Sequence, residues 1–216
     1  EHSVNWSQML KLIHLTGMEK SMKNQYQNAS NISARIQLHN KYSTNTQGWF
    51  PWIFDQCHMA EHSTVLEIGC GDGSLWLENK EKIPKQLHVV LSDISEGMLR
   101  DTRRAIHANV KTSRFDFQVF DCERIPYPDN SFDLVIANHI LFYCKNLTSV
   151  FEEISRVLKT GGTFVCSTYG AAHMKEINEL VSEFDDRIVL SADRLFERFG
   201  KENGADLLAP YFQNIK

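Results

Sequence analysis

Short apolar runs recur along the chain from residue 64 onward, and most are separated by stretches in which apolar residues have helical spacing. The apolar runs are Thr64–Ile68, Leu87–Asp93, Phe115–Asp121, Phe132–Ala137 and Gly162–Thr168. The helical stretches are Ser74–Lys82, Ser95–Asn109, Thr148–Leu158, His173–Phe184 and Ala192–Gly200. Strands that alternate with helices predict right-handed crossovers, so we expect an α/β fold built on a mostly parallel sheet.

The first 60 residues follow a different pattern, polar at first and then aromatic. Apolar spacing predicts a helix over Ala29–His39, and another begins within Gly48–Phe54, where Pro51 is tolerated in a first turn. We expect residues 1–60 to form an N-terminal helical cap on a domain that spans residues 61–216.

The amino-acid composition is that of a globular protein, and the net charge argues against one class of partner, nucleic acid. Hydrophobic residues make up 42%, aromatic residues 11% and charged residues 23% of the chain. The 23 Lys and Arg residues against 27 Asp and Glu give a net charge of −4, which argues against a general nucleic-acid binder. No apolar stretch is long enough to cross a membrane, and the N-terminal residues lack the pattern of a signal peptide. We expect a cytoplasmic protein.

The five cysteines are odd in number, widely spaced and without a CxxC pair; they are Cys57, Cys70, Cys122, Cys144 and Cys166. This usage predicts reduced thiols, rather than a disulfide framework or a zinc site, and we expect no bound metal.

A glycine-rich turn follows the first apolar run, in the segment Glu67-Ile68-Gly69-Cys70-Gly71-Asp72-Gly73. Ligands of open α/β sheets bind beyond the carboxyl ends of the strands, and glycines there let the backbone approach a ligand. A tight turn without a ligand is the alternative. The nicotinamide-dinucleotide fingerprint is not met, because it requires glycine where the chain has Ser74.

Three acids, Glu67, Asp93 and Asp121, each come at the end of a successive predicted strand. The carboxyl ends of parallel strands lie along one rim, so these acids are expected close to the glycine turn. Asp93 is placed to accept hydrogen bonds from ribose hydroxyls, and Asp121-Cys122 to meet an adenine amino group. The alternatives are a helix cap by Asp93 or Ser95 and a loop acid at Asp121.

Four segments together resemble the motifs of class I S-adenosylmethionine-dependent methyltransferases: VLEIGCGDGS, LSDISEGML, FDCERIPYPDNSFDLVIANHILFY and EISRVLKTGGTFV. The resemblance covers about residues 64–168 and is closest to the small-molecule branch that includes the ubiquinone/menaquinone biosynthesis methyltransferases. It implies a Rossmann-like, doubly wound sheet with helices on both faces. It also implies methyl transfer from S-adenosylmethionine to a small-molecule acceptor, with S-adenosylhomocysteine as the product.

The resemblance implies a set of cofactor-binding residues around the strand ends. The glycines line the methionine part, Asp93 holds the ribose, Ile94 flanks the adenine, and Asn138 lies near the methionine moiety. The full expected set is Glu67, Gly69, Cys70, Gly71, Asp93, Ile94, Asp121, Cys122 and Asn138.

On the acceptor side, His139 is the candidate general base because it follows the fourth strand; the alternative is that it packs or orients the cofactor loop. Tyr143, Arg35 and Tyr42 are candidate substrate contacts. Similar enzymes place an N-terminal lid and a helical substrate cover, here about residues 171–190, over the pocket. The lid also carries His39, Trp49 and Trp52, and packing within a helix is the alternative for the two tryptophans.

Two other functions remain open: methylation of RNA or protein, and a non-catalytic S-adenosylmethionine-binding sensor or scaffold. The chain end also differs from the fold it resembles, in which an antiparallel hairpin of two further strands follows the fifth. Here the pattern after Thr168 is helical as far as Leu208. We therefore expect that the C-terminal strand hairpin is missing, that the sequence is a shortened form of a longer protein, and that the bare fifth strand permits a homodimer.

Overall fold

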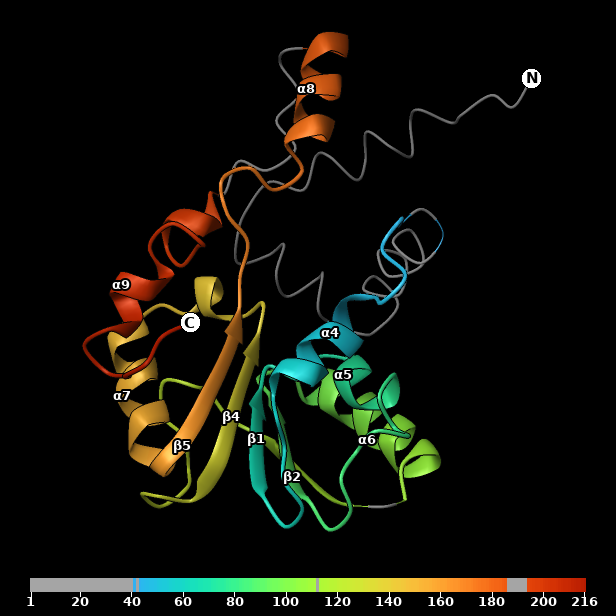
Figure 1. The fold of residues 1–216 in the computed structure, drawn as a ribbon, viewed down its shortest axis with the longest axis vertical. Helices are drawn as coiled ribbons and strands as arrows, with labels where there is room; N and C mark the ends of the chain where they lie inside the picture. Colours follow the sequence, from blue (N-terminus) through green and yellow to red (C-terminus); the bar gives the residue numbers. More distant parts are fainter. Residues whose placement is uncertain (1–40, 42, 112, 186–193) are drawn as a thin grey trace.

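Five parallel strands form one sheet in the order β3-β2-β1-β4-β5 (Figure 1). The computed structural model describes residues 41, 43–111, 113–185 and 194–216. The strands are β1 Thr64–Ile68, β2 His88–Asp93, β3 Arg114–Val119, β4 Phe132–Asn138 and β5 Leu158–Ser167. The parallel α/β sheet expected from the sequence is confirmed, whereas the helix expected over Ala29–His39 lies outside the described residues.

Helices flank the sheet on both sides (Figure 1). They are α4 Trp49–Gln56, α5 Ser74–Leu77, α6 Glu96–Asn109, α7 Leu147–Val157, α8 Lys175–Phe184 and α9 Gly204–Leu208, with short 3-10 helices η1 Leu141–Tyr143 and η2 Leu195–Glu197. In Figure 1, α4, α5 and α6 lie on one side, α7 and α9 on the other, and α8 projects beyond the end of β5. No helix in the described part of the chain is long and apolar enough to cross a membrane.

Successive residues of the central strands pack alternately into two separate hydrophobic cores, one on each face of the sheet. Val65 of β1 packs in the core formed with α4, α5 and α6, whereas its neighbour Leu66 packs in the core formed with α7 and α9. Leu134 and Val135 of β4 divide in the same way. Burial on both faces explains why these strands are continuous apolar runs rather than alternating ones.

Side-chain caps fix where two long helices begin. The Ser95 hydroxyl accepts a hydrogen bond from the Met98 N–H at the start of α6, and Asn146 Oδ1 accepts one from the Ser149 N–H at the start of α7, both at 3.2 Å. Pro51 lies in the first turn of α4, as predicted.

The helix predicted over Ser74–Lys82 is shorter in the structure, where α5 ends at Leu77. The amide of Asn79 explains the early end, because its Nδ2 donates to the carbonyls of Leu75 (2.8 Å) and Phe50 (3.2 Å). The side chain thereby takes the Leu75 carbonyl that a continuing helix would use.

Gly161 and Gly162 follow the predicted helix Thr148–Leu158, and in the sequence they predict a helix C-cap that leads into a strand. The structure shows that this prediction is wrong. Helix α7 ends at Val157, and β5 begins directly with Leu158. The glycines lie inside β5 at a register shift, since Phe132 of β4 pairs with Leu158 while Leu134 pairs with Thr163. Gly161 has a φ of +80°, which fits an irregularity within a strand.

The predicted helix Ala192–Gly200 is also wrong where the structure describes it. Residues 195–197 form only η2, and α9 starts at Gly204. The Asn203 side chain separates the two, because its Oδ1 accepts from the Gly200 N–H (2.7 Å) and its Nδ2 donates to the Glu197 carbonyl (2.8 Å).

Strand order reverses between β1 and β4. From β1 the chain runs outward through β2 to β3, then returns to pair β4 with the other side of β1. The crevice beyond the carboxyl ends at such a switch point is where open α/β sheets bind ligands. Within the described residues β5 is the outer strand on the β4 side, with β4 as its strand neighbour.

Candidate functional site

Three glycines shape the turn after β1, and each is needed for a different reason. Gly69, Gly71 and Gly73 all have positive φ, at +69°, +54° and +77°. A Cβ on Gly69 would lie 2.4 Å from a methyl of Ile140, and one on Gly73 would lie 2.8 Å from a methyl of Thr102. Among the residues that the structure describes, a Cβ on Gly71 would meet no atom within 4 Å. Gly71 thus borders open space, as a backbone cradle for a ligand requires.

Asp93, the last residue of β2, bonds directly to this turn. Its Oδ2 accepts a hydrogen bond from the Gly71 N–H at 3.2 Å, and its Oδ1 accepts one from the Ser95 N–H at 2.8 Å. Burial raises the pKa of this carboxyl above its ordinary value, while the N–H donors act in the opposite direction. Each oxygen keeps a further lone pair, so the carboxylate can hold the turn and still accept from a ligand hydroxyl.

Apolar surface lies exposed beside Asp93. The Ile94 side chain is 73% exposed, and Val119 at the end of β3 is 47% exposed. Asp121 is exposed two residues beyond the observed end of β3, where its Oδ1 accepts from the Glu123 N–H (3.0 Å). The sequence predicted a strand that reaches Asp121. Because β3 ends at Val119, Asp121 is instead a loop residue at the rim, which is the alternative that the sequence left open.

Glu67 lies beneath the rim, not on it. The side chain is buried and its Oε2 accepts a hydrogen bond from Trp76 Nε1 at 2.6 Å, while Oε1 accepts a longer one from Asn138 Nδ2 at 3.5 Å. Burial raises the pKa of this carboxyl to about 8. Cys70 is likewise buried, and its N–H donates to the Ser92 carbonyl. These two side chains support the turn from below.

The end of β4 is tied to the end of β5 through one serine. Ser167 Oγ donates to Asn138 Oδ1 at 3.2 Å and accepts from the His139 N–H at 3.1 Å. A hydrogen-bonded chain therefore runs from Trp76 through Glu67, Asn138 and Ser167 to His139 across the carboxyl ends of three strands. Such a network fixes the backbone on which the candidate base is held.

A row of aromatic rings runs across the rim from α4 to the loop after β5. The Trp49 ring lies 5.0 Å from the His139 ring, which lies 6.2 Å from Phe142. Phe142 is 5.1 Å from Tyr169, and Tyr169 is 5.0 Å from His173. Burial, and secondarily the charge of His173, lower the pKa of His139. Both effects favour the neutral form of the imidazole at the centre of this row.

The other predicted acceptor contacts divide into described and undescribed residues. Tyr143, at the end of η1, is half-buried with its ring 4.6 Å from Phe142. Arg35, Tyr42 and His39 lie outside the described residues. Trp49 and Trp52 are 40% and 43% exposed, so they are not simply buried helix-packing residues.

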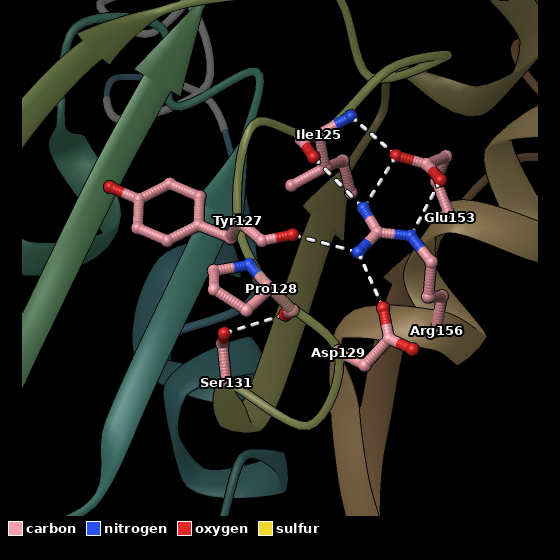
Figure 2. Close-up of polar contacts among 7 residues, drawn as sticks. All are labelled: Ile125, Tyr127, Pro128, Asp129, Ser131, Glu153 and Arg156. Carbon is pink, nitrogen blue, oxygen red and sulfur yellow. Dashed lines mark hydrogen bonds and ion pairs between the residues drawn. The ribbon is translucent and has the colours of Figure 1, made fainter.

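The loop between β3 and β4 is anchored by one arginine of α7 (Figure 2). Arg156 donates to the carbonyls of Ile125 and Tyr127 at 2.9 and 2.7 Å and pairs with Asp129 at 2.9 Å. It also forms a bidentate pair with Glu153, whose Oε2 accepts from the Ile125 N–H at 2.7 Å. This cluster holds the loop that starts at the rim with Asp121.

Sequence reasoning missed two residues of the site. Ser167 stands at the end of β5 just as Asp93 stands at the end of β2, so the rule that singled out the acids also applies to it. Ile140 was missed because its contact with Gly69 depends on the path of the chain after β4. Among the described residues, no group of three or more His, Cys, Asp or Glu side chains is arranged to hold a metal ion.

Known sequences match the segment that carries this rim. A profile described as a methyltransferase domain matches residues 66–166. The demethylmenaquinone methyltransferase of Symbiobacterium thermophilum is 32% identical over 118 residues, which are 55% of this chain and 47% of that enzyme. The ubiquinone/menaquinone biosynthesis C-methyltransferase UbiE of Geobacter sulfurreducens is 29% identical over 144 residues, 65% of this chain and 55% of that enzyme. The chain thus spans about half the length of the curated relatives it matches.

A solved structure shares the fold over most of the chain. It is the phosphoethanolamine N-methyltransferase 2 of Haemonchus contortus, in complex with S-adenosyl-L-methionine. The TM-score is 0.63, with coverage of 92% of this chain and 44% of that chain, at 19% sequence identity. At this identity the likeness establishes the Rossmann-like fold alone.

Proposed function

We propose that the chain is a class I S-adenosylmethionine-dependent methyltransferase related to the ubiquinone/menaquinone methyltransferases, and that it transfers a methyl group from S-adenosylmethionine to a small-molecule acceptor. The methyltransferase domain profile that matches residues 66–166 and the similar menaquinone and ubiquinone/menaquinone enzymes support this proposal. One observation carries the proposal: Gly71 opens onto free space while its N–H is held by the carboxylate of Asp93. An open backbone cradle beside a fixed acid is what a ribose with an amino-acid tail requires.

The residues of the rim fit the cofactor part by part. Gly69 and Gly71 would line the methionine portion, Asp93 would accept from the ribose hydroxyls, and the exposed Ile94 would cover one adenine face. Asp121 and Cys122 would border the adenine edge. Glu67, Cys70 and Asn138 would act mainly by supporting the turn, because their side chains are buried or already hydrogen-bonded.

The acceptor would lie against the aromatic row, with His139 facing its nucleophilic atom. Bound S-adenosylmethionine supplies a methyl group already activated by its sulfonium, so the chain mainly has to place the acceptor in line. The neutral His139 would take a proton where the acceptor is an oxygen or nitrogen nucleophile. Trp49 and Tyr143 would contact the acceptor, and Arg35 and Tyr42 remain proposed contacts from the N-terminal lid.

Two measurements on the purified chain test this function. Calorimetry with S-adenosylhomocysteine should give saturable 1:1 binding, and incubation with methyl-labelled S-adenosylmethionine and a panel of small-molecule acceptors should give a labelled product. Mass spectrometry of ligand that co-purifies with the chain would direct the choice of panel. Binding without turnover across the panel would instead support the sensor, and label transfer to RNA or protein would support the macromolecular alternative. Absence of binding would contradict the proposal.

Two further properties are proposed on narrower grounds. The five cysteines are all free thiols, which supports a reducing compartment such as the cytoplasm. The outer position of β5 supports a homodimer formed along that strand. Light scattering across a range of protein concentrations tests the dimer, and a concentration-independent monomer mass would rule it out.

A further inference from the structure

Two cysteines meet at the rim although 22 residues separate them in the chain. Cys122 follows β3 and Cys144 follows η1, and their Sγ atoms lie 3.4 Å apart. A disulfide requires an S–S distance of about 2.05 Å, so closure needs an approach of only ~1.4 Å. Both thiols are partly exposed, so a small oxidant can reach them.

The backbones on either side of this sulfur contact are already clamped together. Glu123 Oε1 accepts from the Lys145 N–H at 3.0 Å and from the Asn146 N–H at 2.9 Å. One carboxylate therefore holds the residues next to both cysteines. The sulfur atoms are thus held near each other by a contact that does not involve them.

The other three thiols are in different surroundings. Cys57 Sγ donates to the Ile53 carbonyl within α4, and Cys70 Sγ donates to the Gly71 carbonyl. Burial raises the pKa of Cys57 and of Cys166 to about 12, and the pKa of Cys122 is raised as well, so the short distance between the Cys122 and Cys144 sulfur atoms, rather than thiol acidity, distinguishes the rim pair. Cys57, Cys70 and Cys166 therefore serve as internal controls for any reaction of the rim pair, Cys122 and Cys144.

We propose that Cys122 and Cys144 form a reversible disulfide when the protein meets a hydroperoxide, and that this bond staples the loop after β3 to the loop after β4. One thiolate attacks an oxygen of the hydroperoxide and the O–O bond breaks. The attacking cysteine becomes a sulfenic acid, and the other oxygen takes a proton and leaves as an alcohol or water. The second thiol then displaces water from the sulfenic acid. Overall the two thiols lose two protons and two electrons, which the hydroperoxide takes up.

The contact with Cys144, together with burial, raises the pKa of Cys122. The attacking thiolate is therefore scarce at neutral pH, and disulfide formation should be faster at pH 9 than at pH 7.

The test is a thiol count before and after treatment of the reduced chain with hydrogen peroxide. We expect the count under denaturing conditions to fall from five to three, a peptide map to link Cys122 with Cys144, and dithiothreitol to restore all five. Cys144→Ser should give no linked pair in the peptide map at the same dose, because Cys122 stops at the sulfenic acid without a second thiol. The matched control Cys57→Ser should still form the Cys122–Cys144 bond and lose two of its four thiols. Five intact thiols, a different pair, or a sulfinic acid on one cysteine would overturn the proposal.

The disulfide should also change the affinity of the protein for the cofactor, an inference that rests on the proposed function. Cys122 adjoins Asp121 at the proposed adenine edge, so closure should displace that edge and weaken binding of S-adenosylhomocysteine by several-fold, reversibly with dithiothreitol. Cys144→Ser should bind equally before and after peroxide. No binding by the reduced protein would contradict the proposed function, whereas a linked pair with unchanged affinity would overturn only the control of binding.

Discussion

The carboxylate of Asp93 accepts a hydrogen bond from the backbone N–H of Gly71, which precedes it by 22 residues in the turn after β1. The bond joins the ends of two adjacent parallel strands and fixes the turn against the acid. The glycine turn and the acid are therefore one structural unit, although the sequence presents them as two separate motifs.

Replacing Asp93 with alanine should weaken binding of S-adenosylhomocysteine about 30–150-fold, which corresponds to roughly 2–3 kcal/mol for loss of a charge-assisted contact. Calorimetry measures the dissociation constant, and circular dichroism checks the fold. Asp101→Ala is the control, because Asp101 lies on α6 and pairs only loosely with Arg100 and Arg104 at 3.7 Å. An unchanged dissociation constant in folded Asp93→Ala would remove the ribose assignment.

Alanine at Gly69 and at Gly71 should have different effects. Both positions have positive φ, so both variants lose about 1–2 kcal/mol through backbone strain. Gly69→Ala adds a clash with Ile140 at 2.4 Å and should lower the melting temperature further. Gly71→Ala adds a methyl only to the open cradle and should mainly weaken cofactor binding. Equal melting temperatures for the two variants would contradict this distinction.

His139 has a φ of +52°, so the variant chosen to test it must tolerate the left-handed region. Asparagine does so better than alanine, and His139→Asn should lower turnover by roughly 10²–10⁴-fold with cofactor affinity preserved. Under the proposed function, because burial lowers the pKa of His139 below its ordinary 6.5, the rate of methyl transfer by the wild-type chain should fall only as the pH drops below that value. A variant that loses cofactor affinity instead would assign His139 to binding.

Glu67 should make stability depend on pH. Its pKa in the folded chain is about 8, above the ordinary 4.5, so the folded state holds a proton that the unfolded state releases between these values. The stability it contributes is complete below pH 4.5 and is lost as the pH rises to about 8. Glu67→Gln keeps an acceptor for Trp76, and its free energy of unfolding should rise relative to that of the wild type by up to roughly 5 kcal/mol across this range. Urea unfolding at several pH values measures it, with the exposed Glu152→Gln as the control. Parallel curves for wild type and Glu67→Gln would contradict the prediction.

Arg156→Lys should destabilise the chain even though the charge is retained. Lysine cannot reproduce the planar fork that serves Glu153, Asp129 and two carbonyls, so we expect a loss of about 1–3 kcal/mol in urea unfolding. Arg103→Lys is the matched control, because among the described residues Arg103 contacts only Phe117, through one long hydrogen bond to its carbonyl at 3.4 Å and through its ring, 5.2 Å from the guanidinium. Equal stability of the two variants would show that the cluster in Figure 2 contributes little.

The rim was predictable because it depends on the ends of strands. Apolar runs buried on both faces are distinctive, and a polar residue directly after such a run must lie at the edge of the sheet. This logic placed Asp93 correctly, and it would also have found Ser167. The same logic wrongly predicted that the Glu67 side chain lies on the rim. Glu67 is still within β1, one residue before its end, so its side chain is buried beneath the rim, where it pairs with Trp76.

The errors arose where side chains far apart in sequence decide the local structure. The Asn79 side chain that takes the Leu75 carbonyl at the end of α5 also donates to the Phe50 carbonyl, and nothing in the sequence near residue 79 indicates this second, distant partner. Gly161 resembles a helix cap in sequence because a register shift between β4 and β5 needs the same backbone freedom. The contact between Cys122 and Cys144 was likewise hidden, because it depends on the lengths of two loops.

The aromatic row differs from the glycine turn in where its residues lie along the chain. Trp49, Tyr169 and His173 lie outside residues 66–166, the segment that matches the methyltransferase domain profile, whereas the glycine turn and Asp93 lie within it. The two central rings of the row, His139 and Phe142, also lie within that segment. The match over residues 66–166 therefore describes the glycine turn and Asp93 but not the outer rings of the row, so the acceptor has to be sought with this chain itself rather than inferred from the match.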